Sequence, residues 1–139
     1  MRNYIRIVEA ASRGCPRATH DIDLNLKNRQ RAIDKYHYGP ANPDKPDAYW
    51  QEVAKRWNIT EKIARTMTCS NCSAFDVSDV MRSCIESGIK GDEPATDAMA
   101  SIHKADLGYC NFHAFKCAGS RSCTSWITGG AIDNKDRTK

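Results

Sequence analysis

Residues 107–126 read LGYCNFHAFKCAGSRSCTSW and carry three of the seven cysteines of this 139-residue chain. Two more stand upstream in a C-x2-C pair, Cys69-Ser-Asn-Cys72. A pair with this spacing can place two thiolates on one metal ion or on two corners of a metal cluster. Because the number of cysteines is odd, disulfides alone would leave one thiol over, and metal or cluster ligation is favoured over a disulfide framework. We therefore expect a small domain organised around its cysteines.

The composition is that of one ordinary globular domain. Hydrophobic residues make up 40% of the chain and charged residues 27%, which allows one small core and argues against disorder throughout. The sequence contains no apolar run close to the roughly 18 residues of a membrane helix. The first fifteen residues lack the long apolar stretch of a secretory signal, so we expect a reducing compartment.

Four short amphipathic helices are expected between residues 47 and 108. Asp47 is the expected N-cap of the first, in which Trp50, Val53, Ala54 and Trp57 recur at the spacing of one helical face. Capping and first-turn residues predict where the other three begin, and glycines predict where two of them end: the starts are Asn58 or Thr60, then Ser78 and Pro94, and the ends are Gly88 and Gly108. The stretch from residue 109 to 130 has little helical period, so the expected fold class is mostly α with irregular cysteine-rich loops.

Residues 1–46 show no such helical pattern. Ile22, Leu24 and Leu26 alternate with polar residues in one short strand-like stretch. Residues 36–47, YHYGPANPDKPD, contain three prolines and a glycine, which predict an extended linker. We therefore expect residues 1–46 to form an extended basic arm, residues 47–130 to form a cysteine-rich domain that folds without it, and residues 131–139 to form a loose tail.

The basic excess of the chain is confined to its first part. Residues 1–60 contain 11 basic and 7 acidic side chains, whereas residues 61–139 contain 10 of each, which together give a net charge of +4. A basic arm can bind an acidic protein surface or nucleic acid. Because Asp21, Asp23 and Asp34 dilute the basic field and few aromatic side chains are available to stack on bases, we expect a protein partner rather than nucleic acid.

The cysteines of the second half resemble a known arrangement. GYC at 108–110, Phe112, a Gly-Ser turn and SCTSW at 122–126 resemble the C-terminal half of high-potential iron–sulfur proteins. The 12 residues between Cys110 and Cys123 fit that family, whereas the 37 between Cys72 and Cys110 exceed its usual spacing and would accommodate an inserted helical pair at residues 78–105. Over residues 47–130 the chain is similar to small tailed-phage proteins described as high-potential iron–sulfur-like.

This resemblance implies a cofactor, a site and a setting. The implied cofactor is a 4Fe–4S cluster, and the implied ligands are Cys69, Cys72, Cys110 and Cys123. An apolar jacket favours the less charged, oxidised state of such a cluster, and backbone N–H groups aimed at sulfur offset part of its charge. The candidate jacket consists of aromatic side chains near the ligands: Phe75, Tyr109, Phe112, Phe115 and Trp126. The implied setting is a phage virion, with the protein made in the host cytoplasm.

Zinc is the main alternative to the cluster. The alternative ligands form a Cys3His set at the spacing of a zinc finger: Cys69, Cys72, Cys110 and His113. Cys84 and Cys117 are surplus to both sets, and Cys84 is expected to be a buried, inert thiol on its helix. A Cys84–Cys117 disulfide is a minor alternative. Cys15, which lies in the expected arm, is expected to be unrelated to the other cysteines.

The sequence has no catalytic motif of the common kinds: it has no glycine-rich phosphate loop, no G-x-S-x-G and no H-E-x-x-H. We therefore expect a protein without enzymatic activity. The first hypothesis is a structural component of a phage particle, present in several copies, in which a 4Fe–4S cluster cross-links a small domain and the N-terminal arm docks on neighbouring subunits. A soluble one-electron carrier and a zinc-binding module for nucleic acid or protein are the alternatives.

Overall fold

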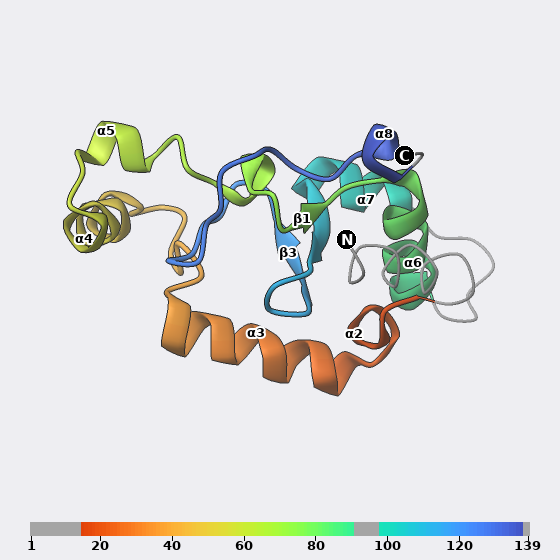
Figure 1. The fold of residues 1–139 in the computed structure, drawn as a ribbon. Helices are drawn as coiled ribbons and strands as arrows, with labels where there is room; N and C mark the ends of the chain where they lie inside the picture. Colours follow the sequence, from red (N-terminus) through yellow and green to blue (C-terminus); the bar gives the residue numbers. More distant parts are fainter. Residues whose placement is uncertain (1–14, 91–97, 138–139) are drawn as a thin grey trace.

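The computed structural model describes residues 15–90 and 98–137. These residues form a mostly helical domain with one small antiparallel sheet of three strands (Figure 1), which confirms the coarse expectation of a small helical, cysteine-rich domain. The described helices are α2 (Arg17–His20), α3 (Ile22–Tyr36), α4 (Asp47–Trp57), α5 (Glu61–Ala64), α6 (Asp79–Lys90), α7 (Ala98–Ala105) and α8 (Asn134–Arg137), together with the 3-10 turn η1 (Cys69–Asn71). None of the helices within these ranges is long and apolar enough to cross a membrane.

The sheet separates two sets of side chains. Its strands are β1 (Phe75–Asp76), β2 (Leu107–Cys110) and β3 (Phe115–Ala118), in the order β1-β2-β3. In β2 and β3, Cys110 lies opposite Phe115 and Gly108 lies opposite Cys117. Because side chains alternate between the two faces of a strand, Cys110 and Cys117 share one face and Tyr109 points to the other. The hairpin that joins β2 and β3 was not expected from the sequence.

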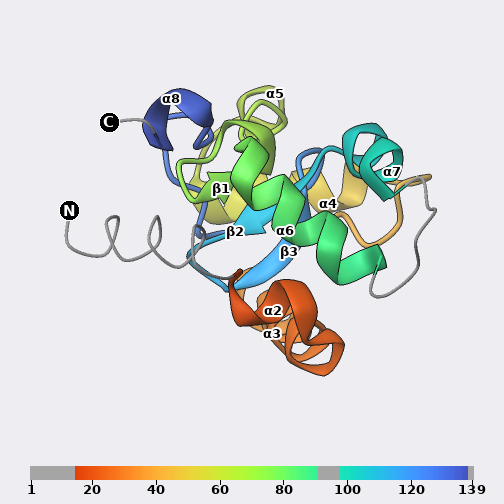
Figure 2. The ribbon, with the colours of Figure 1, turned by 90° about the vertical axis from the view of Figure 1, so that its right-hand side faces the viewer.

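The face that carries Tyr109 is covered by helices. Figure 2 shows α6 crossing the sheet, with α2 and α7 beside it, and all three contact their neighbours in this layer. The core here consists of Ala18, Met81, Cys84, Ile85, Ile102 and Tyr109, all of them buried. Burial of aliphatic side chains the size of Met81, Ile85 and Ile102 contributes about 1.5–3 kcal/mol each, which makes this layer a main source of stability.

Two close connections join α2 to α6. A Cβ atom on Gly88 would lie 1.6 Å from the carbonyl oxygen of Thr19, so only glycine permits the helices to approach this closely. Cys15 and Cys84 form a disulfide. The expectations that Cys15 is unrelated to the other cysteines and that Cys84 is a free thiol or pairs with Cys117 are therefore wrong, because α2 packs on α6 and brings Cys15 to Cys84.

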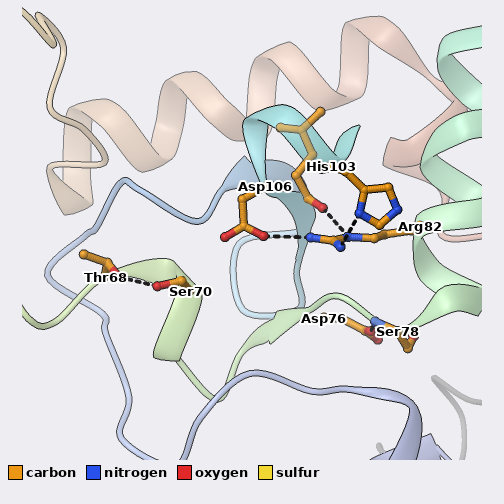
Figure 3. Close-up of polar contacts among 8 residues, drawn as sticks. Thr68, Ser70, Asp76, Ser78, Arg82, His103 and Asp106 are labelled. Carbon is orange, nitrogen blue, oxygen red and sulfur yellow. Dashed lines mark hydrogen bonds and ion pairs between the residues drawn. The ribbon is translucent and has the colours of Figure 1, made fainter. Parts of the chain in front are cut away.

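Arg82 holds the start of β2 against α6 (Figure 3). Its guanidinium donates to the Leu107 carbonyl oxygen at 3.0 Å and to a carboxylate oxygen of Asp106 at 2.7 Å, and it lies 3.2 Å from Nδ1 of His103. The Arg82 side chain is only 13% exposed, so these contacts are shielded in part from water. They fix the chain between α7 and β2.

The open edge of β3 is closed by side chains rather than by a fourth strand. The Lys116 N–H donates to Oδ1 of Asn25 at 2.8 Å, and the Ala118 N–H donates to the Tyr38 hydroxyl at 3.0 Å. One residue before β3, the Ala114 carbonyl oxygen accepts from Nδ2 of Asn28 at 2.7 Å. Because buried backbone groups need partners, α3 and the residue two positions after it are integral to the sheet.

The expected extended arm is therefore wrong for the residues after position 14. Residues 22–36 form one helix, α3, where Ile22, Leu24 and Leu26 suggested a short strand. Its N-cap is Asp21, whose carboxylate accepts from the Leu24 N–H at 3.0 Å. Residues 15–46 contribute to both main cores, so residues 47–130 are not a separate folding unit in this structure.

The expected loose tail is likewise wrong up to residue 137. Ile132 bridges to Asp76, since its N–H donates to the Phe75 carbonyl oxygen at 2.7 Å and its own carbonyl oxygen accepts from the Val77 N–H at 2.9 Å. Asn134, at the start of α8, exchanges hydrogen bonds with Asp79. This segment covers the β1 edge of the sheet.

Most of the expected helix starts are confirmed. The Thr60 hydroxyl accepts from the Ile63 N–H, and Ser78 Oγ accepts from the Met81 N–H. α4 begins at Asp47 itself, one residue from the expected cap. The expected start at Pro94 lies outside the described residues.

Both glycines that were expected to end helices have other roles. α6 continues past Gly88 to Lys90, and Gly108 lies within β2. A Cβ atom on Gly108 would lie 2.6 Å from the ring of Phe75, so the missing side chain leaves room for that ring. The helix before it ends instead at Ala105, followed by Asp106 with φ 49°.

Replacing Asn25 with Ala should lower the free energy of unfolding by about 1–3 kcal/mol, because the partly buried Lys116 N–H loses its acceptor. The matched control is Lys27→Ala on the same helix, where the side chain is exposed and the expected change is within about 0.5 kcal/mol. Urea unfolding of both variants measures the difference. Equal stabilities would show that α3 does not complete the sheet edge.

Replacing Cys84 with Ser should destabilise the oxidised protein, because the Cys15–Cys84 disulfide closes a sequence separation of 69 residues. The chain-entropy model gives about 4 kcal/mol for a loop of this length. The reduced wild type and Cys84→Ser should unfold at similar urea concentrations. In denaturant with chelator, five of the seven thiols should react before reduction, and seven reactive thiols would contradict the disulfide.

Candidate metal centre

Five free cysteines meet on the sheet face opposite Tyr109. Four are buried in one core cluster and Cys110 packs against it; the four are Cys69, Cys72, Cys117 and Cys123. They come from η1, the residue after it, β3 and the loop after β3, and Cys110 closes β2. The structure therefore brings together all four cysteines expected as ligands and adds a fifth, Cys117.

The C-x2-C turn is held by the chain that carries Cys123. The Cys69 N–H donates to the Arg121 carbonyl oxygen at 2.7 Å, and the Ser73 N–H donates to the Ile127 carbonyl oxygen at 2.9 Å. Trp126 donates from Nε1 to the Thr68 carbonyl oxygen at 2.9 Å. The SCTSW segment and the C-x2-C turn therefore form one unit, although more than 50 residues separate them in sequence.

Within this turn, polar side chains support the backbone. Oδ1 of Asn71 accepts from the Thr68 N–H at 3.2 Å and from Nε1 of Trp126 at 2.9 Å. The hydroxyls of Thr68 and Ser70 lie 2.6 Å apart (Figure 3). These contacts fix the direction in which Cys69 and Cys72 leave the turn.

Backbone N–H groups point at the sulfurs. The Ile127 N–H donates to Sγ of Cys72 at 3.4 Å, and the His113 N–H donates to Sγ of Cys110 at 3.3 Å. Burial raises the pKa of the Cys123 thiol, and the backbone N–H of Ser125 counteracts part of that shift. Such donors stabilise negative charge on sulfur, which thiolate ligands carry.

The thiols differ in how readily they release their protons. A hydrogen bond from Cys117, with help from the N–H groups of His113 and Phe112, lowers the pKa of Cys110 to about 7 although burial opposes it. Burial raises the pKa of Cys123 to about 12 and also raises that of Cys72. Burial is the main cause that raises the pKa of Cys117, followed by its contacts with Cys110 and Cys69.

The expected aromatic jacket is present in part. Phe75 and Phe115 are 2% and 1% exposed and belong to the core cluster of the thiols, and Trp126 packs against it. Two expected members do not take part. Phe112 is 57% exposed in the loop between β2 and β3, and Tyr109 belongs to the core on the opposite face because it alternates with Cys110 along β2.

The rest of the jacket comes from the segment expected to be an arm. Ala32 and Tyr38 are buried in the thiol cluster, with Ile33 and Tyr36 packed against it. The ring of Tyr38 meets that of Phe115 edge to face at a centroid distance of 4.9 Å. Burial raises the pKa of the Tyr38 hydroxyl well above its usual value, so Tyr38 lines the site as an uncharged side chain. Two features of the sequence could have pointed to these residues: Asp21 as a possible helix N-cap, and the aromatic residues Tyr36 and Tyr38.

The proline-rich segment contains no helix between residues 37 and 46, has a turn in which the Lys45 N–H donates to the Asn42 carbonyl oxygen, and is attached to the Cys123 loop. Gly39 and Ser122 exchange two backbone hydrogen bonds of 3.0 and 2.8 Å. The Tyr49 hydroxyl donates to the carbonyl oxygens of His37 and Ser122. This attachment positions Cys123 against the rest of the cluster.

The alternative ligand His113 lies between aromatic rings. Its ring centroid is 4.4 Å from that of Tyr36 and 4.7 Å from that of Phe112. The residue is 3% exposed, and its Nε2 atom has no hydrogen-bond partner within the described structure. Burial lowers the pKa of the imidazole, with a further contribution from Arg31, so a neutral ring is favoured.

Within residues 15–90 and 98–137, no three His, Cys, Asp or Glu side chains are arranged to hold a single metal ion. The expected Cys3His set is therefore not assembled around one point. With Zn–S distances of about 2.3 Å, thiolates around one zinc ion lie about 3.8 Å apart. In a 4Fe–4S cube each thiolate binds a different iron. The sulfur–sulfur spacing expected around a single zinc ion therefore tests for a mononuclear site and does not test for a cluster.

No known family model, curated protein or solved structure matches this chain. The donor set must then be judged by its own chemistry. Four or more buried thiols, an apolar surround and N–H groups aimed at sulfur are what a 4Fe–4S cluster requires of a protein. The residues of this site fit that group.

Proposed function

We propose that this chain is a non-enzymatic iron–sulfur protein whose 4Fe–4S cluster is held by Cys69, Cys72, Cys110 and Cys123. The observation that carries this proposal is the meeting of five free thiols, from four separate segments, in one apolar core. The chain contains one disulfide, yet these five cysteines lie close together without forming another. Joint binding of a metal cluster would explain why they lie together as free thiols. No mononuclear arrangement within the described chain offers another.

The role that fits best is structural. When bound, the cluster supplies a covalent cross-link of four thiolates and a one-electron couple. Three of the four proposed ligands lie in residues 65–74 and 119–131, which have little regular secondary structure of their own, and the fourth, Cys110, ends β2. Binding of a metal group to thiolates in loops of this kind contributes directly to folding free energy.

The chain's own residues create the conditions that such a group needs. Phe75, Phe115 and Tyr38 exclude water, and the N–H groups of His113 and Ile127 place partial positive charge on two sulfurs. Exclusion of water disfavours added negative charge, whereas the donors favour it. The balance between the two sets the potential of the site.

Serine at any one of the four proposed ligands should remove most of the iron and acid-labile sulfide and lower the stability of the protein, because one corner of the cross-link is lost. Iron, sulfide and zinc are quantified together after anaerobic purification, with the absorption spectrum. The matched control is Cys84→Ser, which changes a cysteine on the other face of the sheet and should retain its iron.

Several results would contradict the assignment. An iron-free wild type would exclude the cluster. If the wild type instead contains zinc, and His113→Ala loses that zinc, the site would be the Cys3His zinc site. Iron that survives serine at all four positions would require other ligands.

We further propose, from the resemblance to phage proteins, that the chain is a virion component present in several copies and bound to neighbouring subunits. Residues 15–46 are packed into the domain, so docking by the arm falls to residues 1–14. The candidate contacts there lie outside the described residues: Arg2, Tyr4, Ile5, Arg6, Ile7, Val8 and Arg13.

Full-length protein should co-assemble with partner particles, and a chain that lacks residues 2–14 should be incorporated several-fold less. Mass spectrometry of purified particles measures both, and high salt separates basic contacts, which are screened over about 8 Å at physiological ionic strength, from apolar ones. Equal incorporation of the two forms would remove these residues from the docking mechanism and favour the electron-carrier alternative.

A further inference from the structure

A cleft of about 400 Å³ lies where the proline-rich segment meets the end of β3. Pro40, Pro43 and Pro46 line it, together with Trp50 of α4, Ala105 of α7 and the residues that end and follow β3. Its volume lies within the range of about 300–1,000 Å³ that is typical of ligand sites, and so does its mostly apolar lining. No cysteine of the described chain lines the cleft, so it is distinct from the candidate metal centre.

Arg121 is the charged residue among those that line the cleft. Its guanidinium carbon lies 5.5 Å from the centroid of the Tyr38 ring, a cation–π contact that favours one orientation of the side chain. The backbone is fixed as well, because the Arg121 N–H donates to the Ala118 carbonyl oxygen at 3.1 Å and the Arg121 carbonyl oxygen accepts from the Cys69 N–H at 2.7 Å. No Asp or Glu side chain of the described residues forms an ion pair with Arg121. A guanidinium that is held in place and unpaired is suited to bind an anion.

Trp50 brings a second donor to the lining of the cleft. The residue is 5% exposed, and its Nε1 atom forms no hydrogen bond with the described residues. Because a buried indole N–H usually has a partner, this one is available to an acceptor that enters the cleft. The Ser120 hydroxyl, which also lines the cleft, likewise forms no hydrogen bond with the part of the chain that the structure describes.

These features define the chemistry of the ligand. The apolar lining favours an apolar body, and one guanidinium balances one negative charge. A phosphate monoester carries a charge of about −1.5 to −2 at neutral pH, so it would leave excess negative charge beside an apolar lining. A carboxylate carries a single charge, and its two oxygens can accept from Arg121 and from Trp50.

We propose that this cleft binds the carboxyl terminus of a partner polypeptide whose last side chain is apolar. A chain end carries its side chain and its carboxylate on the same carbon atom, so both fit in one small cleft. The last peptide group also offers a partner to the Ser120 hydroxyl, which a simple carboxylic acid does not. This site goes beyond the proposed iron–sulfur function and does not depend on the cluster.

The probe is the peptide acetyl-Ala-Ala-Leu with a free carboxylate, titrated into the full-length protein and followed by calorimetry and by the indole N–H signal of Trp50 in NMR spectra. Three further probes each change one feature. The carboxamide of the same peptide lacks the charge, acetyl-Ala-Ala-Gly lacks the apolar side chain, and isocaproate, a free acid with the same branched chain, lacks the peptide groups. The leucine peptide should shift the Trp50 signal and bind about tenfold more tightly than the carboxamide, the scale of one lost hydrogen bond to a charged group. The other two probes should also bind more weakly than the leucine peptide.

Arg121→Gln should weaken binding of the leucine peptide by about tenfold for the same reason. The matched control is Arg29→Gln, which removes an equal charge from a guanidinium 5.9 Å from the same Tyr38 ring that does not line the cleft, and it should bind like the wild type. Because Arg121 lies close to Cys123 in its loop, a second variant keeps the test independent of that loop. Ala105→Phe places a ring in the cleft from an exposed residue and should also weaken binding.

Absence of saturable binding by the leucine peptide, or equal binding of its carboxamide, would overturn the proposal. Equal losses from Arg121→Gln and Arg29→Gln would also overturn it, because they would reflect net charge alone. If isocaproate binds as tightly as the peptide, the ligand is a free carboxylic acid and the assignment to a chain end is overturned. None of these results bears on the iron and sulfide content, so a failure here is distinguishable from a failure of the proposed function.

Discussion

The open edge of β3 is the constraint on which the arrangement of this domain depends. Two N–H groups of that strand, on Lys116 and Ala118, face away from β2, and the chain satisfies them with Asn25 and Tyr38. Leaving such groups buried without partners would cost about 1–3 kcal/mol each. Because Asn25 and Tyr38 bond to β3, α3 and the residues after it lie along this edge of the sheet. The same placement packs Ala32 and Tyr38 against the thiols.

The two faces of the sheet carry cores of different kinds. One face is an ordinary apolar core, sealed by α2, α6 and α7 and cross-linked by a disulfide. The other is rich in sulfur and is closed by loops, whose order depends on hydrogen bonds between the C-x2-C turn and the SCTSW segment. A cluster on the second face would add covalent bonds where regular secondary structure is sparse. The disulfide and the proposed cluster are thus separated by the sheet itself.

The sequence predicts the helices whose buried face is apolar and misses the helix whose buried face is polar. Trp50, Val53 and Ala54 are apolar at helical spacing, so α4 was predictable to within a residue at its start. α3 was not, because its buried positions are Asn25, Asn28 and Ala32, a helical stripe without large apolar side chains. Hydrophobic periodicity cannot detect a helical face whose buried residues are asparagines that hydrogen-bond to a neighbouring strand.

The cysteines illustrate the same limit. The gathering of Cys69, Cys72, Cys110 and Cys123 followed from spacing and resemblance, and the structure brings them together. The positions of Cys15 and Cys117 followed from neither, since one depends on how α2 meets α6 and the other on the register of β2 with β3. Tyr109 and Cys110 are neighbours in sequence, and strand alternation alone sends them to opposite cores.

The helical pair α4–α5 has a small core of its own, formed by Trp50, Val53, Ala54 and Ala64. Figure 1 shows the pair at the far end of the molecule from α6 and α7. A unit with its own apolar contacts can open locally with a free energy below that of the whole domain. Here the pair is also tied to the sulfur-rich core, because the hydroxyl of Tyr49 in α4 donates to the carbonyl oxygens of His37 and Ser122. A sequence change confined to this pair therefore reaches the loop that carries Cys123 through one tyrosine side chain.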